Sequence, residues 1–411
     1  MVDGRSTFIK KRFMKRIFIL LLLGAAQASV AQVKKSETVP NLDFKTLLNS
    51  PVKSTSLSQL KGKVVLLEFW ATWCGSCLIA MPHLNKLQTK YPKSLQIIAV
   101  TDETEKRAAL YIKSKPANFW FAIDTGRAIA KVFPHQLIPH SILIGPNGKL
   151  IAATSPESIT EKVIDSLLKK QQVHLPEKKD NLVSHEDLIK QNFFASDTVQ
   201  YRFMMQAEIK GDPGLSTTWL DNKAFSGRRL TCINLPLTTL YMLANGHYPY
   251  SRTIDETEVG KKAPVYCLDL IVQNPADLLP ALQKELAKRF DLQAKIKPVI
   301  KDVQILRITD TTKFRSIKKN TSGERTYYAR HGEIDQQMIT MKEFAQYVEN
   351  YGIEKLVVDE TGNAEKFDIK FSFQPENPQS LLNILAGMGL GLTKEQREVN
   401  MLILFKQPVI Y

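Results

Sequence analysis

In the N-terminal third of the chain, short runs of apolar residues alternate with segments whose apolar residues recur at helical spacing. Residues 64–67 form a continuous apolar run, which is typical of a strand buried on both faces of a sheet. Residues 77–91 then carry apolar side chains near helical spacing, at Ile79, Leu84 and Leu87. Further along, the pattern predicts strands at 95–103, 119–124 and 141–151, the last with a turn inside it, and helices at 104–115 and 158–172. This order predicts an α/β domain.

The pattern changes after Gln172. Residues 173–192 are polar, charged and weakly periodic, so we expect an interdomain linker at 173–196 after an N-terminal domain at 32–172. Beyond the linker, the motif RTIDET at 252–257 recurs as LVVDET at 356–361, a shift of 104 residues. Each copy has a helix before the motif and a strand, a helix and a last strand after it. We therefore expect a C-terminal α+β region, 197–411, of two related repeats at about 197–312 and 313–411.

Each repeat is expected to end with its own closing strand. These strands are predicted at 302–308 for the first copy and at 400–405 for the second. Three glycines, Gly387, Gly389 and Gly391, follow the last predicted helix. A phosphate-binding loop would require a strand before the glycines and a lysine after them. The sequence shows neither, so we interpret the glycines as a helix terminus.

The first 31 residues have the form of a secretory signal peptide. Five basic residues between positions 10 and 16 precede an apolar run at 17–23, and small residues at 29–31 offer a cleavage site. The apolar run is shorter than the roughly 20 residues that a membrane-spanning helix needs. We therefore expect a soluble mature protein in the periplasm or cell envelope.

Composition narrows the class of protein further. A chain of 411 residues with 44% hydrophobic content can bury more than one core. The net charge of +15 falls to about +10 when the leader, with six Lys or Arg and one Asp, is removed. The remaining basic residues are spread along the chain and form no recognised nucleic-acid motif, so nucleic acid is not an expected partner.

Cys74 and Cys77 form a C-x-x-C pair where the buried strand passes into a helix. Such a pair can be a redox couple, part of a metal site or a structural disulfide. A zinc site needs two more ligands and none is evident, while a disulfide across so short a loop restricts the unfolded chain little. We therefore predict redox chemistry, with no metal and no cofactor. Cys74, at the helix N-terminus, is the expected nucleophile, and the more buried Cys77 is the resolving thiol.

Residues 57–77, LSQLKGKVVLLEFWATWCGSC, together with Pro82 and Ile138-Pro139, resemble the thioredoxin-like superfamily. The branch that they are most similar to is the exported thiol-disulfide oxidoreductases of the TlpA and ResA type, over about residues 35–170. The resemblance implies that Pro139 is cis and faces the cysteines. It also implies that the Ile138 backbone pairs with a substrate segment and that Trp73 covers the active surface.

Two positions depart from the usual pattern of that branch. Many relatives carry a Glu three residues after the second cysteine, where this chain has Ala80. Glu68 falls where thioredoxins carry a buried acid, and we hypothesise that it relays the proton of Cys77; the alternative is a strand carboxylate paired with a lysine. His140 is the second unusual residue. It either stabilises the Cys74 thiolate or is a polar residue at the rim.

The C-terminal region resembles a bacterial domain family of unknown function catalogued in soil bacteria, and more faintly the N-terminal modules of secretins and TonB-dependent receptors. Neither resemblance implies a reaction. The repeated acid pairs, Asp255-Glu256 and Asp359-Glu360, are interpreted as turn caps. Cys232 and Cys267 have three possible states: a structural disulfide, buried free thiols, or redox partners of the active pair.

The leading functional hypothesis is an extracytoplasmic thiol-disulfide oxidoreductase. Membership of the TlpA and ResA branch implies the reducing direction, a membrane thiol electron donor, and disulfide-containing envelope proteins as substrates. The rival is an envelope-anchored binding or redox-sensing protein whose C-terminal repeats dock a partner. The identity of that partner, the substrate and the oligomeric state are not determined by the sequence.

Overall fold

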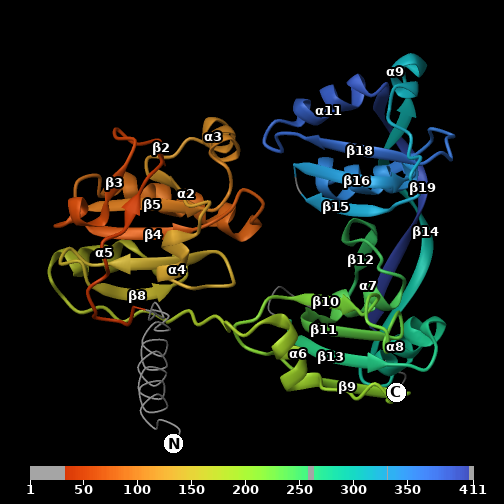
Figure 1. The fold of residues 1–411 in the computed structure, drawn as a ribbon, viewed down its shortest axis with the longest axis horizontal. Helices are drawn as coiled ribbons and strands as arrows, with labels where there is room; N and C mark the ends of the chain where they lie inside the picture. The colour runs from red at the N-terminus through yellow and green to blue at the C-terminus, as the bar shows by residue number, and fades with distance from the viewer. Residues whose placement is uncertain (1–32, 258–262, 331, 407–411) are drawn as a thin grey trace, which may run out of the picture.

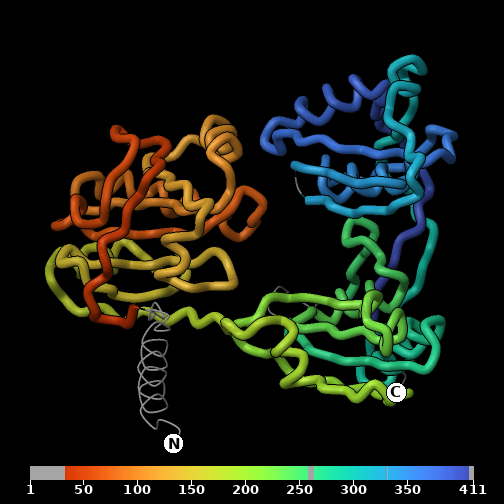
Figure 2. Tube along the Cα trace, viewed as in Figure 1, coloured from red at the N-terminus to blue at the C-terminus, as the bar shows by residue number. Residues whose placement is uncertain are grey.

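The computed structural model describes residues 33–257, 263–330 and 332–406 (Figures 1 and 2). The predicted signal peptide, residues 1–31, lies outside this range. Among the described residues, no helix has the length and apolar content needed to cross a membrane. The described chain forms an N-terminal α/β domain, followed by two C-terminal modules that a long two-stranded ribbon joins.

The N-terminal domain is built on one mixed sheet with the strand order β2-β6-β5-β4-β7-β8. Neighbours β4, β5 and β6 are parallel, whereas β7 and β8 are antiparallel to the strands beside them. This arrangement is the thioredoxin-like fold that the sequence predicted. The strands are β2 Leu47–Leu48, β4 Val64–Phe69, β5 Leu95–Thr101, β6 Trp120–Ile123, β7 His140–Ile144 and β8 Leu150–Thr154, and a small separate pair is β1 Asp43–Phe44 with β3 Thr55–Ser56.

Helices cover both faces of this sheet and bury β4 completely. All six residues of β4 are buried, and alternate side chains enter two different cores. The predicted helices at 77–91, 104–115 and 158–172 are present, and the short α4 was not predicted. The helices are α2 Gly75–Lys90, α3 Glu105–Ser114, α4 Ala128–Val132 and α5 Glu161–Leu168, with 3-10 turns η1 Leu57–Leu60 and η2 Pro156–Ser158.

The connection to the C-terminal region is shorter than the expected linker at 173–196. Helix α6 (His185–Phe193) occupies its second half, with Ser184 as the N-cap. Leu188, Ile189 and Phe193 lie on one face of α6 and are buried against the first module. Helical spacing of these apolar residues within a polar stretch therefore outweighs the linker-like composition.

The two C-terminal modules have the same order of elements. In each, a strand leads to a helix, a short strand, a longer strand, a second helix and one strand of the ribbon. The first module contains β9 Arg202–Ala207, β10 Leu215–Thr218, β11 Arg229–Pro236, α7 Leu237–Ala244, η3 Tyr250–Arg252, β12 Thr253–Asp255, β13 Val265–Ile271, η4 Pro275–Asp277, α8 Leu278–Ala287 and β14 Leu292–Ile308. The second contains α9 Thr311–Arg315, β15 Thr326–Arg330, β16 Glu333–Ile339, α10 Met341–Tyr347 continued by the π-helix Val348–Ile353, β17 Val357–Asp359, β18 Phe367–Ser372, α11 Pro378–Gly387 and β19 Leu390–Lys406.

Strands β14 and β19 form the ribbon that joins the modules. They pair antiparallel over all 17 residues of each strand. At a rise of about 3.3 Å per residue the ribbon is roughly 55 Å long, which is enough to run through both modules. Strands β12 and β17 add in parallel to opposite edges of the ribbon.

The closing strands are exchanged between the repeats. Leu402 and Leu404, near the end of β19, are buried in the core of the first module, whereas Leu306 of β14 is buried in the core of the second. The expectation that each repeat is closed by its own last strand is therefore wrong. Neither strand turns back in a hairpin at the edge of its own module. Each strand runs on and ends in the other module.

The turn that starts β19 explains part of the glycine pattern. Gly387 ends α11, which confirms the predicted helix terminus for this residue, whereas Gly391 lies within β19, so the prediction is wrong for it. Gly389 follows with φ +73°, and a Cβ atom at this position would lie 2.2 Å from the Asp310 carbonyl oxygen. Only glycine fits this turn without displacing the backbone.

The strand exchange predicts that a residue near the C-terminus stabilises the first module. We expect Leu404→Ala to lower the stability of the first module by about 3 kcal/mol, because it removes a fully buried side chain and leaves a cavity. Hydrogen exchange at the backbone amides of β11 and β13 measures this loss. The matched control is Ile300→Ala, also in the ribbon, whose side chain is 69% exposed. If the amides of β11 and β13 were equally protected in both variants, the proposed exchange of closing strands would be contradicted.

Candidate active site

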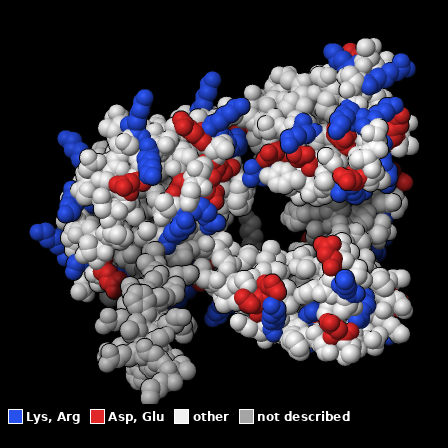
Figure 3. Space-filling model, in the orientation of Figure 1, with Lys and Arg blue, Asp and Glu red and all other residues white. Residues whose placement is uncertain are grey.

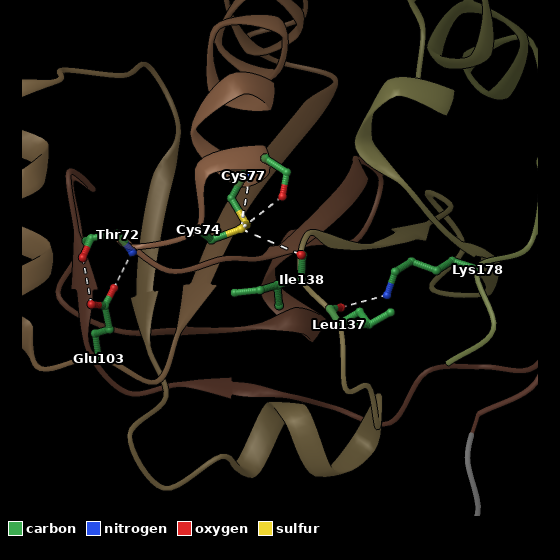
Figure 4. Close-up of a disulfide and its surroundings, with 8 residues drawn as sticks. Thr72, Cys74, Cys77, Glu103, Leu137, Ile138 and Lys178 are labelled. Atoms are coloured by element: carbon green, nitrogen blue, oxygen red, sulfur yellow. Dashed lines mark hydrogen bonds between the residues drawn. A yellow bond between two sulfur atoms is a disulfide. The ribbon is translucent and has the colours of Figure 1, made fainter. Parts of the chain in front are cut away.

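The disulfide between Cys74 and Cys77 lies where β4 passes into α2 (Figure 4). Cys74 is the N-cap of α2, and its Sγ atom accepts a hydrogen bond from the Cys77 backbone N–H at 3.2 Å. Cys74 is the more exposed of the two, at 6% against 1%. The unpaired N–H groups and positive end of the helix dipole therefore favour a thiolate at Cys74 once the disulfide is reduced.

The Ile138–Pro139 peptide bond is cis, as the resemblance implied. This loop leads into β7, which pairs antiparallel with β4 so that His140 lies opposite Phe69. The pairing brings the Ile138 carbonyl oxygen to 3.8 Å from Cys74 Sγ (Figure 4). A peptide segment that paired with the Ile138 backbone would thus lie beside the reactive sulfur.

Exposed apolar side chains surround the disulfide. Trp73 is 51% exposed and Ile79 is 83% exposed. Ile138 borders two hollows, one of which is also lined by Trp73, while the other, about 690 Å³, is lined by Ile79 and Pro139. Exposed apolar surface of this kind is typical of a contact site for another polypeptide.

Glu68 faces the same side of the sheet as the cysteines. The alternation of β4 places Leu66 and Trp70 in the core that contains Cys74 and Cys77, and Glu68 lies between them. Leu67 and Phe69 enter the opposite core. Glu68 therefore lies on the face of the sheet that packs against the cysteine pair.

The environment of Glu68 favours its protonated form near neutral pH. The side chain is 1% exposed, and burial raises its pKa to about 8. Ser141 Oγ donates a hydrogen bond to Oε2, while Oε1 has no hydrogen-bond partner among the described residues. The alternative of a lysine-paired carboxylate is not observed, since Lys178, whose charge acts on Glu68, forms its ion pair with Asp180.

His140 has neither of its expected roles. Its ring is 4% exposed, stacks on His135 with 4.9 Å between centroids, and places Nδ1 3.3 Å from Lys178 Nζ. Burial, with the charge of Lys178, lowers the pKa of His140 to about 3. It is therefore neutral and cannot supply a positive charge to the Cys74 thiolate, and it is too buried to be a rim residue.

Sequence reasoning missed two groups of residues beside the disulfide. Thr72 donates from its backbone N–H and its Oγ1 to the Glu103 carboxylate at 2.6 and 2.8 Å (Figure 4). Lys178 Nζ donates to the Leu137 carbonyl oxygen at 2.8 Å on the other side. No local signal marks these contacts, because 31 and 41 residues separate the partners.

The remaining cysteines do not belong to this site. Cys232 and Cys267 are buried free thiols on adjacent strands, β11 and β13. Cys232 lies opposite Leu268 in the sheet, so Cys267 points to the other face, and the two thiols enter different cores. A disulfide between them is therefore excluded, and burial raises the pKa of Cys232 to about 12, which makes its thiol unreactive.

Of the repeated acids, the two aspartates are turn caps, as predicted, whereas Glu360 forms ion pairs with Arg307 and Arg397. Asp255 accepts hydrogen bonds from the backbone N–H and Oγ1 of Thr257, and Asp359 does the same with Thr361. In the described part of the chain, no group of three or more His, Cys, Asp or Glu side chains is arranged to hold a metal ion.

Comparisons with known proteins match the two parts of the chain separately. Residues 34–168 match the family described as Redoxin, and residues 255–405 match a family described as Protein of unknown function (DUF3738). The chain is 34% identical to the thiol-disulfide oxidoreductase ResA of Bacillus cereus over 169 residues, which is 39% of this chain and 97% of the relative. ResA of Bacillus subtilis is 32% identical over 167 residues, 38% of this chain and 90% of the relative.

Solved structures resemble the N-terminal domain in the same way. A putative thiol:disulfide interchange protein DsbE from Chlorobium tepidum is 28% identical, with a TM-score of 0.31, and covers 33% of this chain and 99% of its own. The cysteine pair at the strand-to-helix junction, the cis-proline loop beside it and the identity to ResA over nearly its full length agree. The chain therefore belongs to the ResA family of thiol-disulfide oxidoreductases.

Proposed function

We propose that this protein is an exported reductase of disulfide bonds in cell-envelope proteins. One arrangement carries the proposal: Cys74 at the N-terminus of α2, 3.8 Å from the Ile138 carbonyl, with buried Glu68 on the same face of the sheet. The relatives named thiol-disulfide oxidoreductase ResA support the reaction class. The proposed export rests on the signal-peptide pattern at residues 1–31.

In the proposed reaction, the reduced enzyme begins with a thiolate at Cys74. This thiolate attacks one sulfur of the substrate disulfide, so that a Cys74–substrate bond forms while the substrate S–S bond breaks. The other substrate sulfur leaves as a thiolate and takes up a proton. Ile138 and Pro139 would hold the substrate segment beside Cys74, and Trp73 would contact its side chains.

Resolution then releases the substrate sulfur that is bonded to Cys74. The Glu68 carboxylate, which becomes populated as the pH approaches its pKa of about 8, takes the proton of Cys77. Cys77 then attacks Cys74 Sγ, so that the Cys74–Cys77 bond forms, the Cys74–substrate bond breaks, and the second substrate thiolate leaves and takes up a proton. Two electrons and two protons have passed to the substrate, and the enzyme is left oxidised. A dithiol donor at the membrane would reduce the pair again by the same exchange chemistry.

The cysteine assignment predicts opposite results for two substitutions. Cys77→Ser should stop the reaction at the mixed disulfide, because no thiol remains to attack Cys74. Cys74→Ser should reduce turnover to background and form no adduct. Turnover is measured with insulin as the disulfide and dithiothreitol as the reductant, and adducts are detected by non-reducing electrophoresis of envelope fractions and mass spectrometry.

Cys232→Ala is the matched control for these variants, because its thiol is buried and unreactive in the first module. It should turn over insulin as the wild type does and trap nothing. If the Cys77→Ser variant captured only cytoplasmic proteins, or if wild-type protein left insulin intact, the proposed function would be wrong.

Glu68 should make the stability of the oxidised protein depend on pH. Its folded pKa of about 8 lies above the ordinary value of 4.5, so the folded state retains a proton that the unfolded state loses in this window. The free energy of unfolding therefore falls as the pH rises from 4.5 to 8, by up to about 1.4 kcal/mol per pH unit. Glu68→Gln should remove this decline, as denaturant titrations at several pH values measure.

The same variant tests the relay. Release of substrate from the mixed disulfide should be slower in Glu68→Gln, and the rise in the release rate that accompanies deprotonation near pH 8 should disappear. The control, Glu105→Gln, changes an exposed acid of α3 and should alter neither property. An unchanged release rate and pH profile in the Glu68 variant would rule out the relay.

The proposed direction of electron flow predicts the reduction potential of the Cys74/Cys77 couple. Equilibration of the mature protein with dithiothreitol or glutathione buffers should give a value of about −270 mV or lower, the range of a reductant. A value of about −120 mV, typical of an oxidant, would reverse the proposed direction.

A further inference from the structure

Residues outside the N-terminal domain contact both loops that flank the disulfide. On one side, the segment after β18 reaches α3, where the Glu376 carboxylate accepts two hydrogen bonds from Arg107, at 3.0 Å from Nη1 and 2.5 Å from Nη2. Arg107 Nε donates to Thr72 Oγ1 at 2.9 Å. Thr72 is two residues before Cys74, so the second module reaches the active-site loop through one intervening side chain.

This contact is well shielded from water. The side chain of Glu376 is 9% exposed and that of Arg107 is 20% exposed. A bidentate arginine–carboxylate pair with this burial holds its two side chains in a defined orientation far better than an exposed ion pair does. Gln374 adds a second anchor on α3, donating to the Leu110 carbonyl oxygen at 3.1 Å and to Ser114 Oγ at 2.7 Å.

On the other side of the disulfide, the connection after the N-terminal domain holds the cis-proline loop. Lys178 Nζ donates to the Leu137 carbonyl oxygen at 2.8 Å (Figure 4). It also donates to Asp180 Oδ1 at 2.7 Å. Asp180 Oδ2 accepts hydrogen bonds from the backbone N–H groups of Gln136 and Leu137, at 2.8 and 2.7 Å. The loop that carries Ile138 is thus held at its carbonyl and amide groups from outside its own domain.

The same connection is fixed to the first module. Asn181 donates from its backbone N–H to the Gly211 carbonyl oxygen at 2.9 Å and from Nδ2 to Asp212 Oδ2 at 2.7 Å. Gly211 has φ +84°, and a Cβ atom there would lie 2.6 Å from the Asn181 nitrogen. Residues 178–181 therefore link the active-site loop to the module without a flexible segment between them.

These contacts close the chain into a ring. The N-terminal domain meets the first module through the connection and the second module through Glu376, and the ribbon of β14 and β19 joins the two modules (Figure 1). In the space-filling view, the domain and the two modules surround an opening (Figure 3). Both attachments to the domain lie beside the redox pair.

We propose that the second C-terminal module and the connection to the first module position the redox site from outside its own domain: Glu376 braces the Thr72 loop, and Lys178 with Asp180 braces the Ile138 loop. The inference rests on the proposed reductase function. It assigns the two modules a part in the reaction that their family description does not state. Glu376, Lys178 and Asp180 are positioning residues, since they act through Arg107 and the Leu137 backbone.

The test uses the full mature chain with paired variants. Glu376→Gln removes the charge that holds Arg107, and Lys178→Met removes the donor to Leu137. The matched controls are Glu365→Gln, an exposed acid of the second module paired with Lys319, and Lys179→Met, whose side chain is 77% exposed. Thermal unfolding must show that all four variants remain folded.

The first readout separates binding from chemistry. Glu376→Gln and Lys178→Met should each lower kcat/KM for insulin about tenfold, mainly through KM, because displaced Thr72 and Ile138 loops hold the polypeptide substrate less tightly. The first attack of Cys74 on oxidised glutathione, which does not need the full surface, should occur at nearly the wild-type rate. The two control variants should match the wild type with both disulfides.

The second readout is the pH profile of mixed-disulfide release. The groups that act on Glu68 are Ser141 from β7, Glu157 from η2 and Lys178 from the connection, and the positive charge of Lys178 lowers the pKa of Glu68. Lys178→Met should therefore move the profile to higher pH, whereas Lys179→Met should not. A general loss of structure would lower activity without moving this profile.

The third readout is the radius of gyration, which shows whether the ring of contacts stays closed. Glu376→Lys places a second positive charge against Arg107 and should open the contact, which small-angle scattering detects as a larger radius of gyration. If Glu376→Gln and Lys178→Met matched their controls in KM and pH profile while the wild type reduced insulin, the positioning role would be wrong and the reductase function would stand. If the wild type failed to reduce insulin, the proposed function itself would fail.

Discussion

The antiparallel pairing of β4 with β7 sets the geometry on which the redox site depends. Because His140 lies opposite Phe69 at the end of this register, the loop after β4 and the loop before β7 emerge side by side. The first loop carries the cysteines and the second carries Ile138 and Pro139. Their separation is therefore fixed by backbone hydrogen bonds in a fully buried strand pair, which are among the least deformable contacts in the protein.

Burial then gives each ionisable group near the pair a distinct state. Glu68 is held protonated near neutral pH because desolvation penalises its carboxylate, and His140 is held neutral because desolvation and Lys178 penalise its imidazolium. Lys178 forms an ion pair with Asp180 at 2.7 Å. The site thus combines a carboxyl that can accept a proton once it deprotonates, a neutral ring and an ion pair within one strand pair and the segment packed against it.

The exchanged strands explain how a distant module can influence this site. Because β14 and β19 each contribute to both C-terminal cores, the two modules are tied together along a continuous ribbon. The anchor at Glu376 in the second module and the anchor of Asn181 on Asp212 of the first module are therefore mechanically connected without passing through the N-terminal domain. A pair of modules joined only by a flexible link would not transmit such a constraint.

The sequence by itself determined the order of strands and helices in the N-terminal domain and the place of the cysteine pair between a buried strand and a helix, because these depend on local spacing. The thioredoxin-like fold and the choice of Glu68 followed from the resemblance of residues 57–77 to a known family. The sequence also determined the order of elements in the two repeats and the turn-capping role of Asp255 and Asp359. Tertiary structure alone decided the exchange of closing strands, since both copies carry the same local pattern, and the separation of Cys232 from Cys267, since a one-residue step in register changes the face of a sheet. It also decided the contacts of Lys178 and Glu376, which join residues far apart in sequence by single side chains that no periodicity reveals.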